Sequence, residues 1–159
     1  MAERIATLFG LGHLPGAPGT YASLAAIPLA WALHALGGFW LLGPATLALS
    51  GLGLWAAARM GPDGDPPQIV IDELVGMLIA LWPLSLGLTL QGKGAEVWPW
   101  PGWVLGFLLF RFFDIVKPPP VNWAERAPGA LGVMLDDIVA GALTALVALA
   151  AAAVAHGWL

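Results

Sequence analysis

The chain has 159 residues, of which 59% are hydrophobic and only 10% are charged, with a formal net charge of −4 and a mean hydropathy of +0.83. Because soluble domains carry roughly 25% charged residues, this composition excludes a water-exposed globular protein and indicates an integral membrane protein. The absence of cysteine excludes disulfides, thiolate metal sites and a cysteine nucleophile, and the lack of any basic run argues against nucleic acid as a partner.

Apolar stretches long enough to cross or enter a bilayer recur along the whole chain. A spanning helix needs about 20 apolar residues, and the linkers between these stretches are rich in Gly and Pro. The predicted membrane helices are Ser23–Leu36, Phe39–Met60, Ile69–Leu90, Gly102–Val116 and Leu135–Trp158. The first and fourth are short, so we expect them to tilt or to span only part of the bilayer. The sequence therefore predicts an all-α membrane helical bundle of about five helices, with residues 1–159 forming a single domain.

The distribution of Lys and Arg predicts the orientation of this bundle. Cytoplasmic segments of membrane proteins carry an excess of these residues. If the N-terminus is cytoplasmic and the five helices alternate in direction, Lys93 alone lies on the outer side of the membrane. The remaining five fall on or near the cytoplasmic side: Arg4, Arg59, Arg111, Lys117 and Arg126.

Acidic and basic side chains gather at the ends of three predicted helices on this cytoplasmic face. They are Asp72 and Glu73 in the first turn of the third helix, Arg111, Asp114 and Lys117 at the end of the fourth, and Asp136 and Asp137 at the start of the last. Taken singly, each residue has a plain explanation as a helix cap or an interfacial anchor. Capping does not explain two adjacent acid pairs, because the second carboxylate repels the first.

A hard divalent cation such as Mg²⁺ removes this repulsion, because it binds carboxylate oxygens. Arg111, Asp114 and Lys117 are spaced three residues apart and share a helix face, and an Arg fork suits phosphate. The preceding GAPGT segment adds the hydroxyls of Thr20 and Ser23, and we expect Ser23 to cap the first helix. A plain turn is the alternative for this glycine-rich segment. The pattern favours phosphoryl chemistry at a membrane face.

Two other classes of function compete with this interpretation. An ion or metabolite transporter would also place acids in the membrane, but transport sites lie near the midplane and often between repeats. Here the charges lie at one end and the sequence has no evident repeat. Another enzyme acting on a phospholipid headgroup, such as a phosphatidic acid phosphatase or a phosphotransferase, is the nearer alternative.

Four sequence blocks resemble the phosphatidylglycerophosphatase A family, in the family's order. The blocks are FGLGHLPGAPGTYASLAAIP (9–28), DPPQIVIDELVGMLIA (65–80), FRFFDIVKPPPVNWAER (110–126) and GVMLDDIVAG (132–141). The chain differs at Ala22, where the family usually has Gly. The resemblance implies a Mg²⁺-dependent phosphatase of bacterial phospholipid synthesis in the inner membrane, which removes the terminal phosphate of phosphatidylglycerophosphate on the cytoplasmic side.

The resemblance also suggests roles for the polar residues. Glu73, Asp136 and Asp137 are expected to hold Mg²⁺, and Asp72 to support them or act as a general base. Arg111 and Lys117 are expected to bind the phosphate and stabilise its developing charge. From the glycine-rich segment itself, Thr20 and Ser23 are expected to help bind the substrate. Asp114 either orients Arg111 or is itself the nucleophile. Attack by a metal-bound water is the favoured alternative to an aspartyl-phosphate.

Overall fold

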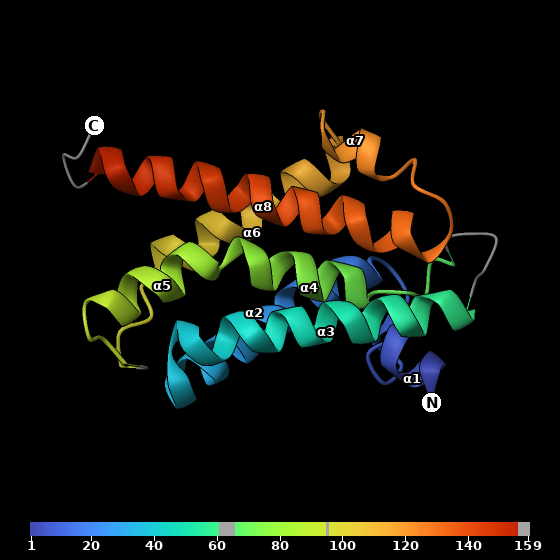
Figure 1. Cartoon of the computed structure of the whole chain (residues 1–159), viewed down its shortest axis with the longest axis horizontal. Helices are drawn as coiled ribbons and strands as arrows, with labels where there is room; N and C mark the ends of the chain where they lie inside the picture. The colour runs from blue at the N-terminus through green and yellow to red at the C-terminus, as the bar shows by residue number, and fades with distance from the viewer. Residues whose placement is uncertain (61–65, 95, 156–159) are drawn as a thin grey trace.

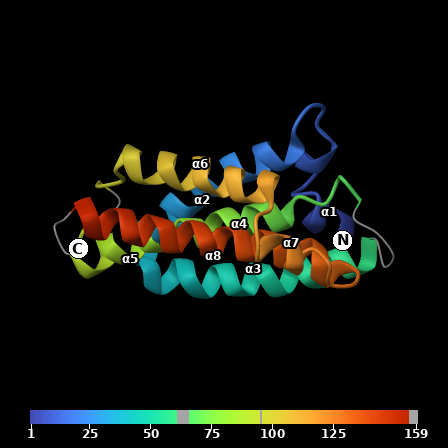
Figure 2. The ribbon, with the colours of Figure 1, turned by 90° about the horizontal axis from the view of Figure 1, so that it is seen from above.

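Every regular element in the described part of the chain is helical, and the long helices lie side by side in one bundle (Figures 1 and 2). The computed structural model describes residues 1–60, 66–94 and 96–155. In chain order the elements are α1 (Ala2–Ala6), the 3₁₀ turn η1 (Leu11–His13), α2 (Pro18–Gly37), α3 (Phe39–Met60), α4 (Ile71–Ala80), α5 (Trp82–Leu90), α6 (Trp100–Val116), α7 (Val121–Ala124) and α8 (Ala130–Ala155). The short helices α1 and α7 lie in the half of the bundle that holds the N-terminus, and α8 ends in the other half (Figure 1).

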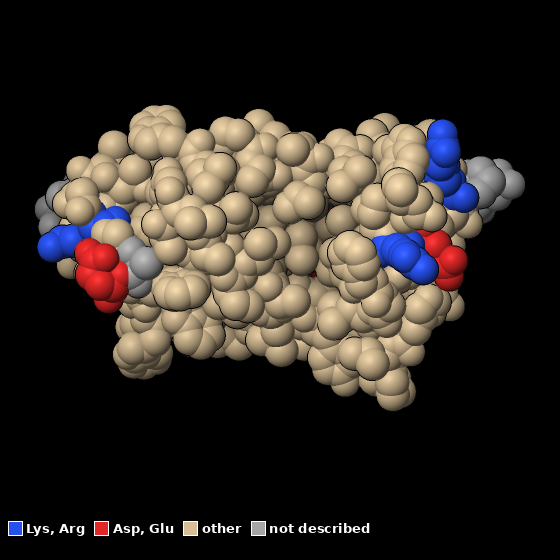
Figure 3. Space-filling model, turned by 90° about the horizontal axis from the view of Figure 1, so that it is seen from below, with Lys and Arg blue, Asp and Glu red and all other residues tan. Residues whose placement is uncertain are grey.

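The lengths and surfaces of the helices fit a membrane environment. By length and composition, α2, α3, α8 and the combined segment Ile71–Leu90 can each cross a membrane. Helix α6 has 17 residues and is therefore about 26 Å long, slightly less than the ~30 Å hydrocarbon core. On the face shown in Figure 3, charged residues lie at the two ends and an uncharged surface lies between them. The predicted all-α membrane bundle is thus confirmed, with α6 as its short helix.

The first long helix begins earlier than predicted. It starts at Pro18 instead of Ser23, because proline suits the first turn of a helix, where its missing N–H is not needed. The helix therefore has 20 residues and is not short. Ser23 lies inside it, buried, and its hydroxyl donates to the carbonyl of Gly19 at 2.8 Å. The prediction that Ser23 caps this helix is wrong.

The last helix also begins earlier than predicted, at Ala130 instead of Leu135. Asp136 and Asp137 consequently lie in its second turn, and the prediction that they open the helix is wrong. The predicted end of this helix at Trp158 lies outside the described residues.

The predicted third helix is interrupted near its middle. Helix α4 ends at Ala80, and α5 continues from Trp82 after Leu81. Pro83 explains the break, since it has no N–H to donate to the carbonyl of Ile79 and its ring crowds the preceding turn.

Helix α4 is the centre of the bundle and packs against α2, α3, α6 and α8. Every residue of α4 except Glu73 is buried. Its closest partner is α8, because glycines remove the side chains where the two helices cross. A Cβ atom on Gly141 would overlap the carbonyl oxygen of Gly76, and one on Gly76 would strike the ring of Phe110. The first turn of α4, which carries Asp72 and Glu73, is therefore held at a fixed place against α8.

The N-terminal segment fixes the chain just before α4. The N–H of Val70 donates to the carbonyl of Ala6 at 2.9 Å. Gly12 lies so close to the carbonyl of Gln68 that a side chain there would collide with it. These contacts determine where α4 begins and hence where its two acidic residues lie.

Candidate functional site

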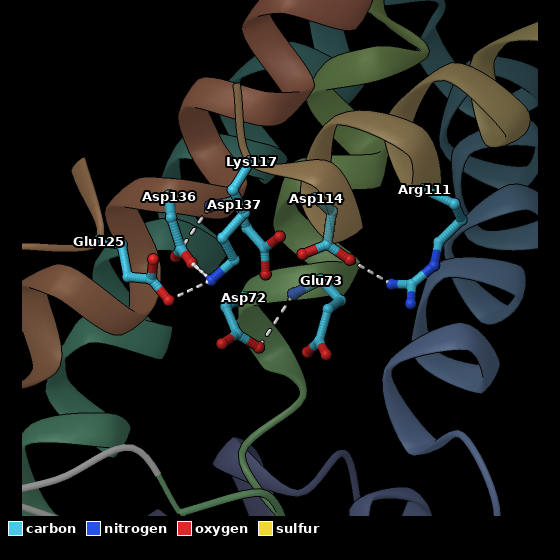
Figure 4. A network of polar contacts seen from close by, with 8 residues as sticks. All are labelled: Asp72, Glu73, Arg111, Asp114, Lys117, Glu125, Asp136 and Asp137. Carbon is cyan, nitrogen blue, oxygen red and sulfur yellow. Dashed lines mark hydrogen bonds and ion pairs between the residues drawn. The ribbon is translucent and has the colours of Figure 1, made fainter. Parts of the chain in front are cut away.

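Three carboxylates from two helices meet inside the half of the bundle that contains the N-terminus (Figure 4). Asp72 and Glu73 come from the first turn of α4, and Asp137 comes from the second turn of α8. One oxygen of each lies within 4.8 Å of the others. Asp72 and Asp137 are buried, and Glu73 is partly buried. We call these three residues the carboxylate centre.

Two oxygens of the carboxylate centre are buried without a hydrogen-bond donor in the described part of the chain. They are Oε2 of Glu73 and Oδ1 of Asp137. Asp72, in contrast, accepts the backbone N–H of Glu73 through Oδ1 at 3.0 Å. Leaving a buried acceptor unpaired costs about 1–3 kcal/mol, and more when it is charged. A bound cation would satisfy both oxygens and offset the repulsion among the three groups. All the atoms that could bind a metal ion here are carboxylate oxygens, which suit a hard ion such as Mg²⁺ better than Zn²⁺.

The start of α2 closes one side of the carboxylate centre. A Cβ atom on Gly19 would overlap Oε1 of Glu73, so the first turn of α2 lies directly against this carboxylate. Thr20 belongs to the same turn and is partly exposed. Ser23 lies one turn further along α2, and its hydroxyl donates a hydrogen bond to the helix backbone. The structure thus brings the GAPGT segment to the acids, with Gly19 in closest contact.

Helix α6 contributes an ion pair beside the carboxylate centre. Nη1 of Arg111 donates to Oδ2 of Asp114 at 2.5 Å, and both side chains are largely shielded from solvent. The predicted shared face of these two residues is therefore confirmed. Figure 4 shows the guanidinium group on the opposite side of the centre from Lys117. Asp114 holds one nitrogen of the guanidinium, whose remaining N–H groups can bind an anion.

Lys117 ends α6 in a left-handed conformation, with φ of 48°. Its ammonium donates to Oδ2 of Asp136 at 2.8 Å and to Oε1 of Glu125 at 2.6 Å. Burial alone would lower the pKa of Lys117, but its hydrogen bonds and the two negative charges outweigh burial and raise the pKa above its usual value. Lys117 therefore stays protonated and joins α6, α8 and the segment after α7.

Asp136 and Asp137 are adjacent in sequence but have different neighbours. Oδ2 of Asp136 accepts from Lys117, and its Oδ1 accepts the backbone N–H of Asp137 at 3.0 Å. Asp137 joins Asp72 and Glu73. Of the three residues predicted as metal ligands, the structure thus brings Glu73 and Asp137 together with Asp72, while Asp136 faces the lysine.

Glu125 was not among the predicted site residues. It is a single acid in a polar linker, and such residues are usually solvated. The feature of the sequence that could have indicated its role was a nearby basic residue, Lys117, on the other side of a proline-rich turn. Sequence spacing alone does not give the direction of that turn.

Comparisons with known proteins place the chain in a family of membrane-lipid enzymes by sequence similarity. Residues 4–152 match the family model described as Phosphatidylglycerophosphatase A. A protein of Bacteroides thetaiotaomicron named "Putative phosphatidylinositol-3-phosphatase" is 40% identical over 143 residues, which cover 86% of this chain and 84% of that protein. Phosphatidylglycerophosphatase A of Escherichia coli is 34% identical over 154 residues, covering 89% of this chain and 77% of the relative. The Haemophilus influenzae protein of the same name is 34% identical over 150 residues, covering 92% and 85%. No solved structure gives a significant match. As its four motifs predicted, the chain belongs to the phosphatidylglycerophosphatase A family of enzymes.

Proposed function

We propose that this enzyme removes the terminal phosphate of phosphatidylglycerophosphate in a Mg²⁺-dependent reaction of bacterial phospholipid synthesis and releases phosphatidylglycerol. The observation that carries the proposal is the carboxylate centre, in which two buried oxygens have no partner among the described residues, next to the Arg111–Asp114 pair. A cation site beside an anion-binding guanidinium suits a phosphomonoester. The location of both in an apolar bundle suits a substrate that is a lipid.

Asp72, Glu73 and Asp137 would hold the metal ion. When bound there, Mg²⁺ would offset the repulsion among the three carboxylates and polarise a phosphoryl oxygen. Asp136 was expected to be a ligand, but its contacts with Lys117 and with the N–H of Asp137 favour a supporting role. The ligand set that we propose therefore exchanges Asp136 for Asp72.

The residues of α6 would bind and orient the phosphate. Arg111 presents a rigid fork of donors that can hold two phosphate oxygens at once. Asp114 fixes the direction of that fork through its ion pair. The pairing favours the orienting role of Asp114 over its role as a nucleophile, because a carboxylate engaged by a guanidinium is a weaker nucleophile.

The distribution of basic residues supports a cytoplasmic location for this site. Arg4 lies in α1, and Arg59 lies in the last turn of α3, against which α1 packs. Lys117 and Arg126 lie on either side of α7, in the same half of the bundle (Figure 1). Lys93 follows α5, in the other half. By the positive-inside rule, the half that holds the carboxylate centre faces the cytoplasm of a bacterial inner membrane.

A second candidate activity comes from the Bacteroides relative, whose name refers to a phosphoinositide 3-phosphate. Both substrates carry a phosphomonoester on a lipid headgroup, so the same metal and guanidinium chemistry applies to either. They differ in the alcohol that carries the phosphate. In phosphatidylglycerophosphate it is a short, flexible glycerol, and in the phosphoinositide it is a rigid inositol ring.

The decisive experiment is phosphate release by the purified protein from a panel of lipid phosphates. The panel contains phosphatidylglycerophosphate, phosphatidic acid and phosphatidylinositol 3-phosphate, each tested with Mg²⁺ and with EDTA. We expect the highest kcat/KM for phosphatidylglycerophosphate and no turnover with EDTA. Faster hydrolysis of the phosphoinositide would select the second candidate. Undiminished turnover in metal-free protein would refute the metal requirement.

A further inference from the structure

A chain of polar contacts leads from a half-exposed residue to the edge of the carboxylate centre. Glu125, whose side chain is 53% exposed, accepts from the ammonium of Lys117. The same ammonium donates to Asp136, which in turn accepts the N–H of Asp137. In Figure 4 the ammonium is held by Glu125 and Asp136, on the side of the carboxylate centre opposite to Arg111.

We infer that Glu125 is a positioning residue, which keeps the charge of Lys117 out of the carboxylate centre so that a metal ion can bind there. This inference rests on the proposed function for its account of what the metal does. Among the described residues, the hydrogen bond and ion pair of the Glu125 side chain are with Lys117, so we infer that Glu125 acts through the lysine.

The physical reason is a competition between two cations for the same carboxylates. The lysine stem is flexible, and its ammonium is a point charge with three donors. Three clustered carboxylates, two of them with unpaired buried oxygens, attract that charge strongly. Asp136 alone supplies one acceptor contact for the ammonium, and Glu125 supplies the second. Without Glu125, the ammonium would gain by turning towards the centre, where it would occupy part of the metal site.

The test is direct binding of Mn²⁺ as a spectroscopic probe, measured by electron paramagnetic resonance on the full-length protein in detergent. Glu125→Gln keeps the size of the side chain and removes its charge. We expect it to bind Mn²⁺ about three- to tenfold more weakly than the wild type, between the effects of an exposed ion pair and a charge-assisted hydrogen bond. Glu125→Asp, which keeps the charge, should restore most of the affinity. The control Glu3→Gln removes another exposed acid and should bind like the wild type.

A second comparison tests whether Glu125 acts through Lys117. In a Lys117→Met background no ammonium remains to be positioned, so adding Glu125→Gln should leave the Mn²⁺ affinity unchanged. An equal loss in both backgrounds would overturn the inference, because Glu125 would then act on the metal directly through its charge. Wild-type affinity in Glu125→Gln would also overturn it. These measurements need no substrate, so failure to hydrolyse phosphatidylglycerophosphate would refute the proposed function without deciding the role of Glu125.

Discussion

The carbonyl oxygen of Asp137 lies only 2.6 Å from the position that a Cβ atom on Gly76 would take, so any side chain at position 76 would collide with it. This contact joins the backbone of one residue of the carboxylate centre to the helix that carries the other two. Asp72 and Glu73 lie four and three residues before Gly76 on α4, respectively, about one helical turn away. The distance between the acids is therefore set by a backbone contact, and not by the acids themselves.

Gly76→Ala should destabilise the protein and separate the acids. The added methyl meets the Asp137 carbonyl and the Phe110 ring, and overpacking of this kind costs about 1–3 kcal/mol. We expect a lower unfolding temperature in detergent and a loss of phosphatase activity. Gly51→Ala in α3 is the matched control, since no atom lies within 4 Å of a Cβ built at position 51. An unfolding temperature for Gly76→Ala equal to that of Gly51→Ala would contradict the close packing of α4 and α8.

Gly19→Ala should impair the site while leaving the fold intact. The new methyl would occupy the position of Oε1 of Glu73, and a flexible carboxylate can move where backbone cannot. We expect normal accumulation, weaker Mn²⁺ binding and at least about tenfold lower kcat/KM, equivalent to about 1.4 kcal/mol of lost transition-state binding. Full activity in this variant would show that Glu73 does not need its observed position.

Asp137→Asn should remove turnover without removing the fold. The amide keeps the size of the carboxylate but deletes a ligand charge, and a catalytic metal supplies several kcal/mol of transition-state stabilisation. We expect activity to fall by roughly a hundredfold or more. In metal-free protein the unfolding temperature should be unchanged or higher, because a buried repulsion is relieved, and its rise on adding Mg²⁺ should be lost. Failure of this variant to accumulate would instead indicate a structural role for the carboxylate.

Arg111→Lys should weaken the binding and orientation of the substrate phosphate. The substitution keeps the charge but deletes the fork that can hold two phosphate oxygens. Activity should fall roughly tenfold or more, on the scale of one charge-assisted hydrogen bond, while Mn²⁺ affinity should change little. Activity equal to that of Glu3→Gln, a charge change away from the site, would remove Arg111 from the proposed mechanism.

The orientation of the bundle can be tested by cysteine labelling, which is convenient because the native chain has no cysteine. Gln91 and Pro128 are exposed and uncharged. Gln91 directly follows α5 and Pro128 lies between α7 and the start of α8, and these elements are in opposite halves of the bundle (Figure 1). A membrane-impermeant thiol reagent added to intact cells should label Gln91→Cys and spare Pro128→Cys. The reverse pattern would place the carboxylate centre on the outer face of the membrane.

The sequence by itself determined the class of protein and the end of the molecule where the polar residues gather. With only 10% charged residues, the chain has too few polar groups to cover a surface that faces water. Successive membrane helices alternate in direction, so acids at the start of one helix and cations at the end of the next are brought to the same face. Local geometry was also predictable, as with Arg111 and Asp114, because residues three apart share a helix face whatever surrounds them. The helix starts at Pro18 and Ala130 were missed because both residues belong to glycine- and proline-rich segments that were predicted to be linkers.

Only the tertiary structure decided which of the acids meet. Consecutive residues on a helix point about 100° apart, so of Asp136 and Asp137 only one can face α4. The choice depends on the rotation of α8 about its axis, which is fixed by the packing of Gly141 against Gly76. That rotation turns Asp137 to the carboxylate centre and Asp136 to Lys117. The pattern of acids in the sequence is the same for either rotation, because the contact that selects one of them involves two glycines without side chains.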